Sequence, residues 1–295
     1  MLCGYIKKVQ PNILTACPDE DYALLDAGEG EKLERYGRYV LSRPDPQALW
    51  RKHLSEKEWL KADAVFLRDG RSTEWKLKPN TPAKWPIKFG GLQLWIKPTA
   101  FKHTGLFPEQ ISNWDWLGET IKKSKRELSV LNLFAYTGGA TLAAAQAGAK
   151  VCHVDGSKSA ISWARENAEL SGLGEKPIRW ILDDVVAFVK REIKRGHKYD
   201  GIILDPPAFG HGPEGEMWKI EENLLDLLDL CKKILSDKPA FFLINGYAAG
   251  YSAIAYENAL RGIISGGELE IGALTIAEEK NDRLLPCGIF ARWHC

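Results

Sequence analysis

The sequence lacks long apolar runs, paired cysteines, internal repeats and low-complexity tracts. No stretch approaches the roughly 18 uninterrupted apolar residues of a membrane-spanning helix, and residues 1–10 lack the apolar core of a signal peptide. The six cysteines are scattered along the chain, which argues against a zinc site and against a disulfide framework. We therefore expect a cytoplasmic protein with reduced thiols, no bound metal and no membrane partner.

A strong excess of one charge is also missing, because the formal net charge is +1. The charge is nevertheless uneven: residues 1–128 hold 22 lysines and arginines against 17 acids, and residues 129–295 hold 18 against 22. Seven of the eleven tryptophans lie in the first part. A basic, tryptophan-rich part is typical of RNA binding, because lysines and arginines pair with phosphates and bases stack on aromatic rings. An excess of five charges is equally an ordinary protein surface, so composition alone leaves both interpretations open.

The residue pattern of the first part of the chain indicates short β strands separated by turn residues. Strands are expected at residues 22–26, 39–42, 64–67, 74–77 and 92–97, and helices at residues 47–60 and 113–125. We predict a β-rich amino-terminal module of residues 1–112 that recognises substrate.

From residue 129 onward, strands and helices alternate. Strands are expected at residues 129–134, 150–155, 178–182, 201–205 and 240–245, and helices at residues 139–146, 158–170, 185–195, 219–235 and 249–264. Two last strands, residues 269–277 and 288–293, have no helix between them and should pair antiparallel at the sheet edge. This pattern predicts an α/β fold with a doubly wound, seven-stranded, mostly parallel sheet in a domain of residues 113–295.

An acid and two prolines follow the apolar run of residues 199–204, which has the composition of a buried strand. Pro206 and Pro207 have no amide hydrogen, so the strand stops there. The turn leaves the Asp205 carboxylate and the Phe209 ring at the sheet edge where ligands bind in open α/β folds. We predict that Asp205, Pro206, Pro207 and Phe209 hold a flat, nitrogen-bearing group beside a reactive cofactor.

The first strand of the second part runs into Phe134-Ala135-Tyr136-Thr137-Gly138-Gly139. Two adjacent glycines permit a sharp turn and close approach of a ligand, and the next helix presents its amino end there. The pattern is not Gly-x-Gly-x-x-Gly, which weakens a dinucleotide interpretation. A tight turn without any ligand is the alternative.

Acids follow later strands at the same edge of the predicted sheet. Asp155 can accept from both hydroxyls of a ribose, or else Asp155 or Ser157 caps the next helix. One of Asp183 and Asp184 can accept from an adenine amine with Val185 against the ring, and the other then serves as a cap. Helix caps alone explain this set of acids less well than a nucleoside site does.

These features together resemble the class I S-adenosylmethionine-dependent methyltransferases over about residues 129–295. Residues 205–209 resemble the Asp/Asn-Pro-Pro-aromatic motif of that superfamily. The resemblance implies S-adenosylmethionine as cofactor, with residues 134–139 at its methionine part, Asp155 at the ribose and Asp184 at the adenine amine. The implied cofactor-binding set in this domain is Phe134, Tyr136, Thr137, Gly138, Gly139, Asp155, Ser157, Asp183, Asp184, Val185 and Asp205.

A narrower resemblance begins at about residue 90. Residues 97–110 are similar to the Lys-Thr-Gly-Phe-x-x-Asp-Gln stretch of bacterial large-subunit ribosomal RNA methyltransferases that modify cytosine C5 or guanine N7, and residues 132–139 and 179–185 fit the same family. The resemblance implies that this stretch closes over the cofactor and that Thr104 and Gln110 contact it. Residues 20–50 resemble a subgroup whose amino-terminal β module differs from the RNA-binding PUA domain.

Two departures limit what this family resemblance implies. No PUA-like segment precedes the β module, so RNA targeting by that domain does not carry over. The cytosine-C5 enzymes need a cysteine nucleophile, but residues 242–247 and the Asp-Pro-Pro loop contain none. Cys287 is the one cysteine near the predicted edge strands, and we interpret it as a small buried residue.

We therefore expect a methyltransferase acting on RNA, most specifically ribosomal RNA, with a nitrogen target favoured over cytosine C5. A methyltransferase for a protein or small molecule is the second hypothesis. The third is a non-catalytic module that binds a nucleotide-like ligand, and a nicotinamide-dependent dehydrogenase is a distant fourth.

Overall fold

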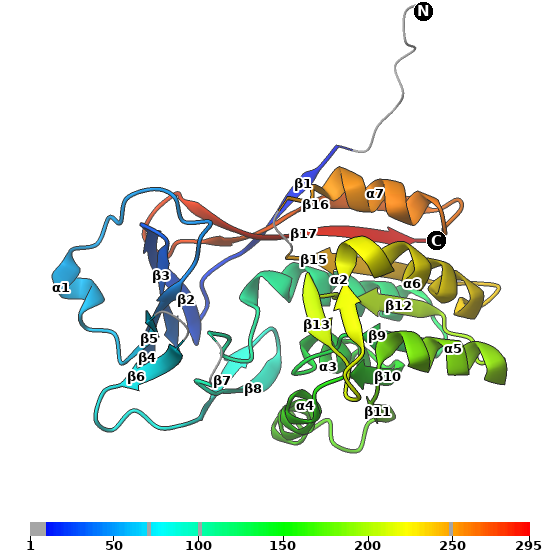
Figure 1. The fold of residues 1–295 in the computed structure, drawn as a ribbon, viewed down its shortest axis with the longest axis horizontal. Coiled ribbons are helices and arrows are strands. Elements are labelled where there is room, and N and C mark those ends of the chain that lie inside the picture. The colour runs from blue at the N-terminus through cyan, green and yellow to red at the C-terminus, as the bar shows by residue number, and fades with distance from the viewer. Residues whose placement is uncertain (1–9, 70–71, 100–101, 248–249) are drawn as a thin grey trace, which may run out of the picture.

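The structure is a computed structural model that describes residues 10–69, 72–99, 102–247 and 250–295 (Figure 1). Residues 1–9, on which the signal-peptide expectation depends, lie outside this set. So do residues 100 and 101 of the 97–110 stretch and residue 249, where the last helix was predicted to begin. Within the described residues, no helix is long and apolar enough to cross a membrane.

A sheet of eight strands forms the centre of the carboxyl-terminal part, in the order β1-β16-β17-β15-β12-β9-β10-β11. Its strands are β1 (Asn12–Ala16), β9 (Ser129–Leu133), β10 (Lys150–Asp155), β11 (Ile178–Leu182), β12 (Gly201–Leu204), β15 (Phe241–Gly246), β16 (Glu268–Ala277) and β17 (Leu284–His294). All neighbours pair parallel except β17, which runs antiparallel to both β15 and β16. The predicted doubly wound, mostly parallel α/β sheet is confirmed, with β1 as an added edge strand.

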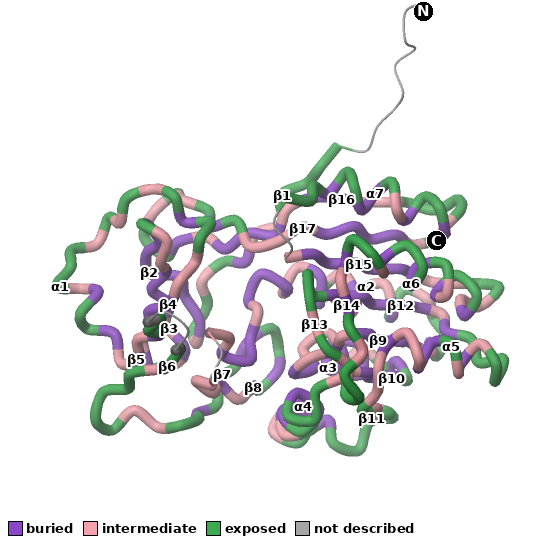
Figure 2. Tube along the Cα trace, in the orientation of Figure 1, coloured by how far each residue is buried: buried purple, intermediate pink, exposed green. Residues whose placement is uncertain are grey.

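Helices cover both faces of this sheet. They are α2 (Ile111–Lys123), α3 (Gly139–Gln146), α4 (Lys158–Leu170), α5 (Val185–Arg195), α6 (Ile220–Ile234) and α7 (Ala253–Arg261). The apolar sides of α2 and α3 pack on one face with Val130 and Phe241, and α5, α6 and α7 pack on the other with Leu131 and Phe242. Because successive strand residues point to opposite faces, these alternating apolar residues bury both faces, as the purple central strands of Figure 2 show.

The amino-terminal part is built from β strands. A five-stranded sheet has the order β2-β3-β4-β5-β6, formed by β2 (Tyr22–Gly28), β3 (Glu31–Tyr36), β4 (Tyr39–Pro44), β5 (Ala64–Asp69) and β6 (Ser72–Leu77). A separate hairpin pairs β7 (Trp85–Phe89) with β8 (Leu92–Ile96), and the short η1 (Pro108–Gln110) leads into α2. Figure 1 shows the β16–β17 hairpin reaching from the large sheet to this module, where Leu24 bridges to Glu278.

The sequence-based prediction of a helix over residues 47–60 is wrong for most of its length. Only α1 (Glu56–Trp59) is helical. The amides of His53 and Leu54 instead donate to the carboxylate of Asp26 on β2. This tertiary contact outweighs the local helical propensity of the segment.

Strands β1, β3 and β7 were not predicted, and neither was the small hairpin of β13 (Phe209–His211) and β14 (Met217–Lys219). β1 has its partner, β16, about 260 residues further along the chain. Local patterns cannot reveal such a pairing, because a short strand becomes stable only when a sheet edge receives it.

Candidate active site

A cavity of about 600 Å³ opens at the carboxyl ends of the central strands. The predicted residues that line it are Phe134, Tyr136, Asp155, Ser157, Asp183, Asp184, Val185, Asp205, Pro206 and Pro207. A smaller space beside it is lined by Gln110, Thr137, Gly138 and Gly139. Two predicted residues line neither space: Thr104 is fully buried, and Phe209 is 54% exposed and packs edge-on against His211.

The loop after β9 is held in an unusual backbone conformation. Phe134 has φ 57° and Tyr136 has φ 47°, both in the left-handed region that non-glycine residues rarely adopt. Gly138, with φ 87°, is the N-cap of α3. Gly139 is needed for another reason, because a Cβ there would clash with the Trp114 ring. The sequence predicted a glycine turn, but the strain itself falls on the two aromatic residues that line the cavity.

Asp155 fastens this loop to the end of β10. Its Oδ2 accepts from the Tyr136 amide at 2.8 Å and its Oδ1 accepts from the Ser157 amide at 2.8 Å. Burial raises the pKa of Asp155, and these two amides oppose that effect. Ser157 is the cap of α4, since its Oγ accepts from the Ala160 amide. The carboxylate of Asp155 is therefore fixed at the cavity wall, where it can accept from a ligand.

The two acids after β11 have different partners. Asp184 caps α5, with Oδ1 accepting from the Ala187 amide at 2.8 Å. Asp183 forms an ion pair with Arg191. Asp184 is thus the capping residue of α5. It is also the residue to which the resemblance assigns the adenine amine, and it lines the cavity.

Asp205 lies at the corner where β12 ends. Its Oδ1 is completely buried and has no hydrogen-bond partner among the described residues. Burial, with the nearby charge of Glu109, raises the pKa of Asp205 to about 7. An unpaired buried carboxyl is costly in a folded protein, so it indicates a place where a ligand supplies the missing donor.

Trp218 fixes the proline corner and was missed by the sequence analysis. Its Nε1 donates to the Pro207 carbonyl at 2.7 Å, and its ring packs against Phe134 at 4.9 Å between centroids. The Pro207 carbonyl is therefore paired, whereas Oδ1 of Asp205 has no partner among the described residues.

Several charged and polar residues of the cavity wall were not predicted from the sequence. They come from four separate segments and are Lys32, Arg43, Asp45, Lys102, His103, Glu109 and Tyr247. Lys102, His103 and Glu109 lie in the 97–110 stretch that the resemblance places over the cofactor, whereas no local motif distinguishes Lys32, Arg43, Asp45 and Tyr247.

Cys287 also lines the cavity, although we expected a merely buried residue. Its thiol donates to the Leu285 carbonyl at 3.4 Å. Burial, reinforced by the charge of Glu109, raises the pKa of Cys287 well above its usual range. The thiol is therefore neutral, whereas nucleophilic catalysis requires the thiolate.

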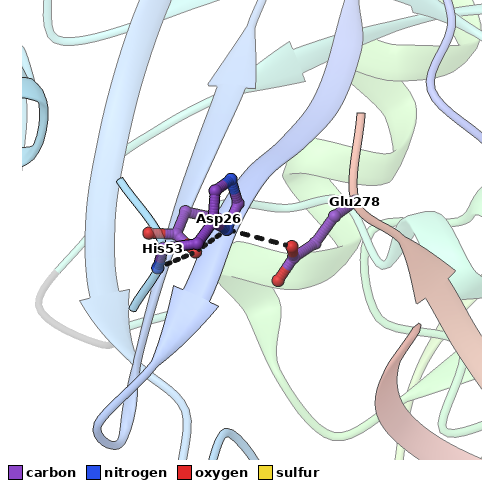
Figure 3. A group of neighbouring side chains, drawn as sticks. All are labelled: Asp26, His53 and Glu278. Carbon is purple, nitrogen blue, oxygen red and sulfur yellow. Dashed lines mark hydrogen bonds and ion pairs between the residues drawn. The ribbon is translucent and has the colours of Figure 1, made fainter. Parts of the chain in front are cut away.

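A second cluster lies away from the cavity, where β2 meets the end of β16 (Figure 3). Nδ1 of His53 is 2.7 Å from Oδ1 of Asp26 and 3.3 Å from Oε2 of Glu278. These three atoms are close enough to hold a metal ion. The same carboxylates also accept from the Leu54 and Ala27 amides, so the cluster ties the module to the β16–β17 hairpin without any ion.

Comparisons with known proteins agree with this geometry. Residues 55–231 match the family model described as S-adenosylmethionine-dependent methyltransferase. A methyltransferase structure from Agrobacterium tumefaciens, described as SAM-dependent, superimposes with a TM-score of 0.92 at 42% identity, covering 96% of this chain and 93% of that one. A structure described as a methyltransferase complexed with SAH shares the fold, with a TM-score of 0.72 at 18% identity over 93% of this chain and 75% of its own.

Curated relatives match over shorter regions. Ribosomal RNA large subunit methyltransferase K of Neisseria meningitidis is 29% identical over 161 residues, which are 54% of this chain and 44% of the relative. Ribosomal RNA large subunit methyltransferase I of Aeromonas salmonicida is 36% identical over 124 residues, which are 42% of this chain and 30% of the relative. The chain thus spans less than half the length of these curated relatives.

Proposed function

Because the chain belongs to the S-adenosylmethionine-dependent methyltransferases, we propose that it methylates RNA, specifically a nitrogen atom of ribosomal RNA. One observation carries the proposal: the unpaired carboxyl of Asp205 faces the same cavity as the acids that suit a nucleoside. In this proposal, residues 113–295 bind the cofactor and residues 1–112 recognise the substrate in the cytoplasm.

The residues present fit this cofactor. The fixed carboxylate of Asp155 suits the ribose hydroxyls, Oδ2 of Asp184 with Val185 suits the adenine, and Phe134 to Gly139 suit the methionine part. Gln110 lines the smaller space and stays a candidate cofactor contact. Thr104 is fully buried and lines neither space, so it can influence the cofactor only through the residues that do. When bound, the cofactor supplies an activated methyl group on a good leaving group.

The chain's own part in the reaction is to position and desolvate the acceptor. Asp205 and the Pro206 carbonyl accept from the N–H groups of the substrate and so direct its lone pair toward the methyl group. Trp218 keeps the corner rigid through its hydrogen bond to Pro207. Phe209 lies on the exposed β13 beside the corner, where its ring is available to a base that approaches from outside.

Two observations support RNA as the substrate. The curated relatives are named as ribosomal RNA methyltransferases, and the cationic part of the chain supplies Lys102 to the cavity beside Lys32 and Arg43, which are paired with Asp45 and Glu34. Incubation with radiolabelled S-adenosylmethionine and separated RNA, protein and metabolite pools tests the proposal. Label should enter RNA, and Asp205→Ala should abolish this transfer while SAH affinity changes little. Label in protein or metabolites alone would reject RNA as the substrate.

The same experiment separates the other hypotheses. Binding of SAH without labelling of any pool would favour a non-catalytic module, and tighter binding of NAD than of S-adenosylmethionine would favour a dehydrogenase.

Methylation of cytosine C5 is a second candidate because Cys287 faces the cavity. A C5 reaction would need the Cys287 thiolate to add to the pyrimidine ring. Cys287→Ala decides between the two: a nitrogen acceptor predicts that transfer to RNA persists, and a C5 acceptor predicts that it is lost.

A further inference from the structure

The Asp26–His53–Glu278 cluster brings together side chains from three separate segments of the chain. Asp26 is on β2, His53 lies in the loop before α1, and Glu278 follows β16. Figure 3 shows the three side chains pointing toward one another, with dashed lines from the imidazole to both carboxylates. Nδ1 of His53, Oδ1 of Asp26 and Oε2 of Glu278 all lie within 4.8 Å of one another. One nitrogen and two oxygens therefore face a common space.

The second oxygen of each carboxylate is held by other donors. Oδ2 of Asp26 accepts from the Leu54 amide at 3.0 Å and from the Trp59 indole at 2.8 Å. Oε1 of Glu278 accepts from the Ala27 amide at 3.1 Å. Carboxylates that bind metals are commonly oriented by such outer hydrogen bonds. These contacts leave one oxygen of each acid directed at the imidazole.

Oε2 of Glu278 has no hydrogen-bond partner among the described residues, although Glu278 is only 4% exposed. The imidazole nitrogen at 3.3 Å does not satisfy it, because the same nitrogen lies 2.7 Å from Oδ1 of Asp26 and carries at most one hydrogen. Asp26 is fully buried. Two buried carboxylates that share a single donor are unfavourable unless a further cation compensates their charge.

The ligand atoms indicate the class of cation. Imidazole suits zinc and other divalent transition metals, whereas magnesium and calcium prefer oxygen ligands alone. In a tetrahedral zinc site with bonds of about 2.0–2.1 Å, neighbouring ligand atoms are about 3.3–3.4 Å apart. The 3.3 Å between Nδ1 of His53 and Oε2 of Glu278 matches this spacing, and the 2.7 Å to Asp26 has to widen when an ion replaces the shared hydrogen. The His53 side chain is 22% exposed, so an ion can enter from solvent and water can complete its coordination.

We propose that Asp26, His53 and Glu278 bind one divalent transition-metal ion such as zinc, which fastens the amino-terminal module to the β16–β17 hairpin. The ligands come from both sides of this contact, so a bound ion holds the two parts together. The site lies away from the cavity and goes beyond the proposed function, on which it does not rest. The sequence-based expectation of no metal was argued from the cysteines, and this ligand set contains none.

Metal binding is measured on the full chain after a chelator has removed all metals. Titration calorimetry with zinc chloride, and elemental analysis after dialysis, should give one zinc ion per chain. Cobalt(II) in place of zinc should give only the weak visible bands of nitrogen and oxygen ligands. The intense near-ultraviolet band of a cobalt–thiolate bond should be absent, which distinguishes this site from binding by the exposed Cys17 and Cys295.

Two substitutions remove one ligand each. Glu278→Gln and His53→Gln should each weaken zinc binding by more than the roughly 10- to 100-fold that altering the outer shell of a metal site costs. The matched controls are Glu268→Gln and His294→Gln at the other end of the same hairpin. Nε2 of His294 is 3.5 Å from Oε2 of Glu268 there, but the described residues offer no third ligand. Both controls should bind zinc as the unchanged chain does.

The melting temperature tests the effect of the ion on the fold. Zinc should raise it in the unchanged chain and in both controls but not in the two ligand variants, since an ion stabilises only the folded state that binds it. A cooperative transition of each metal-free variant verifies that it is folded. Absence of zinc binding by the unchanged chain would show that the cluster is an ion-pair contact only and would overturn the proposal. Zinc binding that persists in both ligand variants, or a cobalt–thiolate band, would place the ion elsewhere and overturn it as well.

Discussion

At the scale of single residues, the buried carboxyl of Asp205 shows how function opposes stability. Its pKa is raised from 3.8 to about 7, so the folded chain holds a proton that the unfolded chain releases between these values. Keeping the ionised carboxyl buried destabilises the folded state. This cost is absent below pH 4, where the carboxyl is protonated in both states, grows as the pH rises toward 7, and is complete above pH 7. Functional sites commonly contain such costly groups.

Replacing Asp205 with asparagine should remove this cost. We expect Asp205→Asn to raise the free energy of unfolding by about 2 kcal/mol at pH 8 and by much less at pH 4. Denaturant titrations of the cofactor-free protein at both pH values measure the difference. A stability change that does not vary with pH would show that Asp205 is not the titrating group.

Asp184 combines a structural role with a proposed binding role, and two substitutions separate them. Asp184→Ala removes the cap of α5 and should cost about 1 kcal/mol of stability. Asp184→Asn keeps a good capping oxygen and should be nearly neutral. Both should weaken SAH binding in calorimetry, because the charged acceptor for the adenine amine is lost. Unchanged SAH affinity in both variants would leave Asp184 with the capping role alone.

The acids that line the cavity at the strand ends could be anticipated because each follows an apolar strand within a few residues. The resemblance of residues 97–110 placed Glu109 and Lys102 in a stretch expected to close over the cofactor, but nothing in their local sequence showed that these two side chains line the same cavity as Asp205.

At the scale of elements, the β-α alternation after residue 129 was strong enough to predict each main strand and helix. Each of these elements buries a periodic apolar face, so its local pattern and its tertiary environment agree. For residues 47–60 the local pattern and the tertiary environment disagree. The composition favours a helix, but the backbone amides of His53 and Leu54 donate to the buried carboxylate of Asp26.

The pairing of β1 with β16 depends on a glycine. A Cβ on Gly272 would collide with the backbone oxygen of Asn12. Gly272→Ala should therefore displace β1, with a cost of about 1–3 kcal/mol and faster proteolysis near residue 17. Gly118→Ala is the control, because a Cβ there meets nothing within 4 Å on the exposed side of α2. Equal protease resistance of the two variants would contradict this role for Gly272.

At the scale of the whole molecule, one apolar cluster crosses the predicted boundary at residue 112. Tyr22 and Ile87 of the amino-terminal module share it with Leu142 of α3 and Ile276 of β16. The Asp26–His53–Glu278 cluster adds a polar connection between the same parts. A shared core of this kind favours unfolding of the two parts as one unit.

We expect a single calorimetric transition whose van't Hoff and calorimetric enthalpies agree. SAH should raise its midpoint without splitting it, since ligand binding stabilises every part that unfolds with the site. Two resolved transitions, of which SAH shifts only one, would instead support independent folding of residues 1–112 and 113–295.

The sequence by itself determined the doubly wound sheet, the Asp-Pro-Pro corner and the acids at the strand ends. These features depend on apolar periodicity, on proline's missing amide and on the length of a strand, all of which are local. The tertiary structure alone decided the extra strand β1, the left-handed aromatic residues before α3 and the wall of cations and carboxyls opposite Asp205. These three features depend on contacts between residues that are tens to hundreds of positions apart in the sequence. Such contacts stabilise the protein only after the chain has folded and brought the residues together.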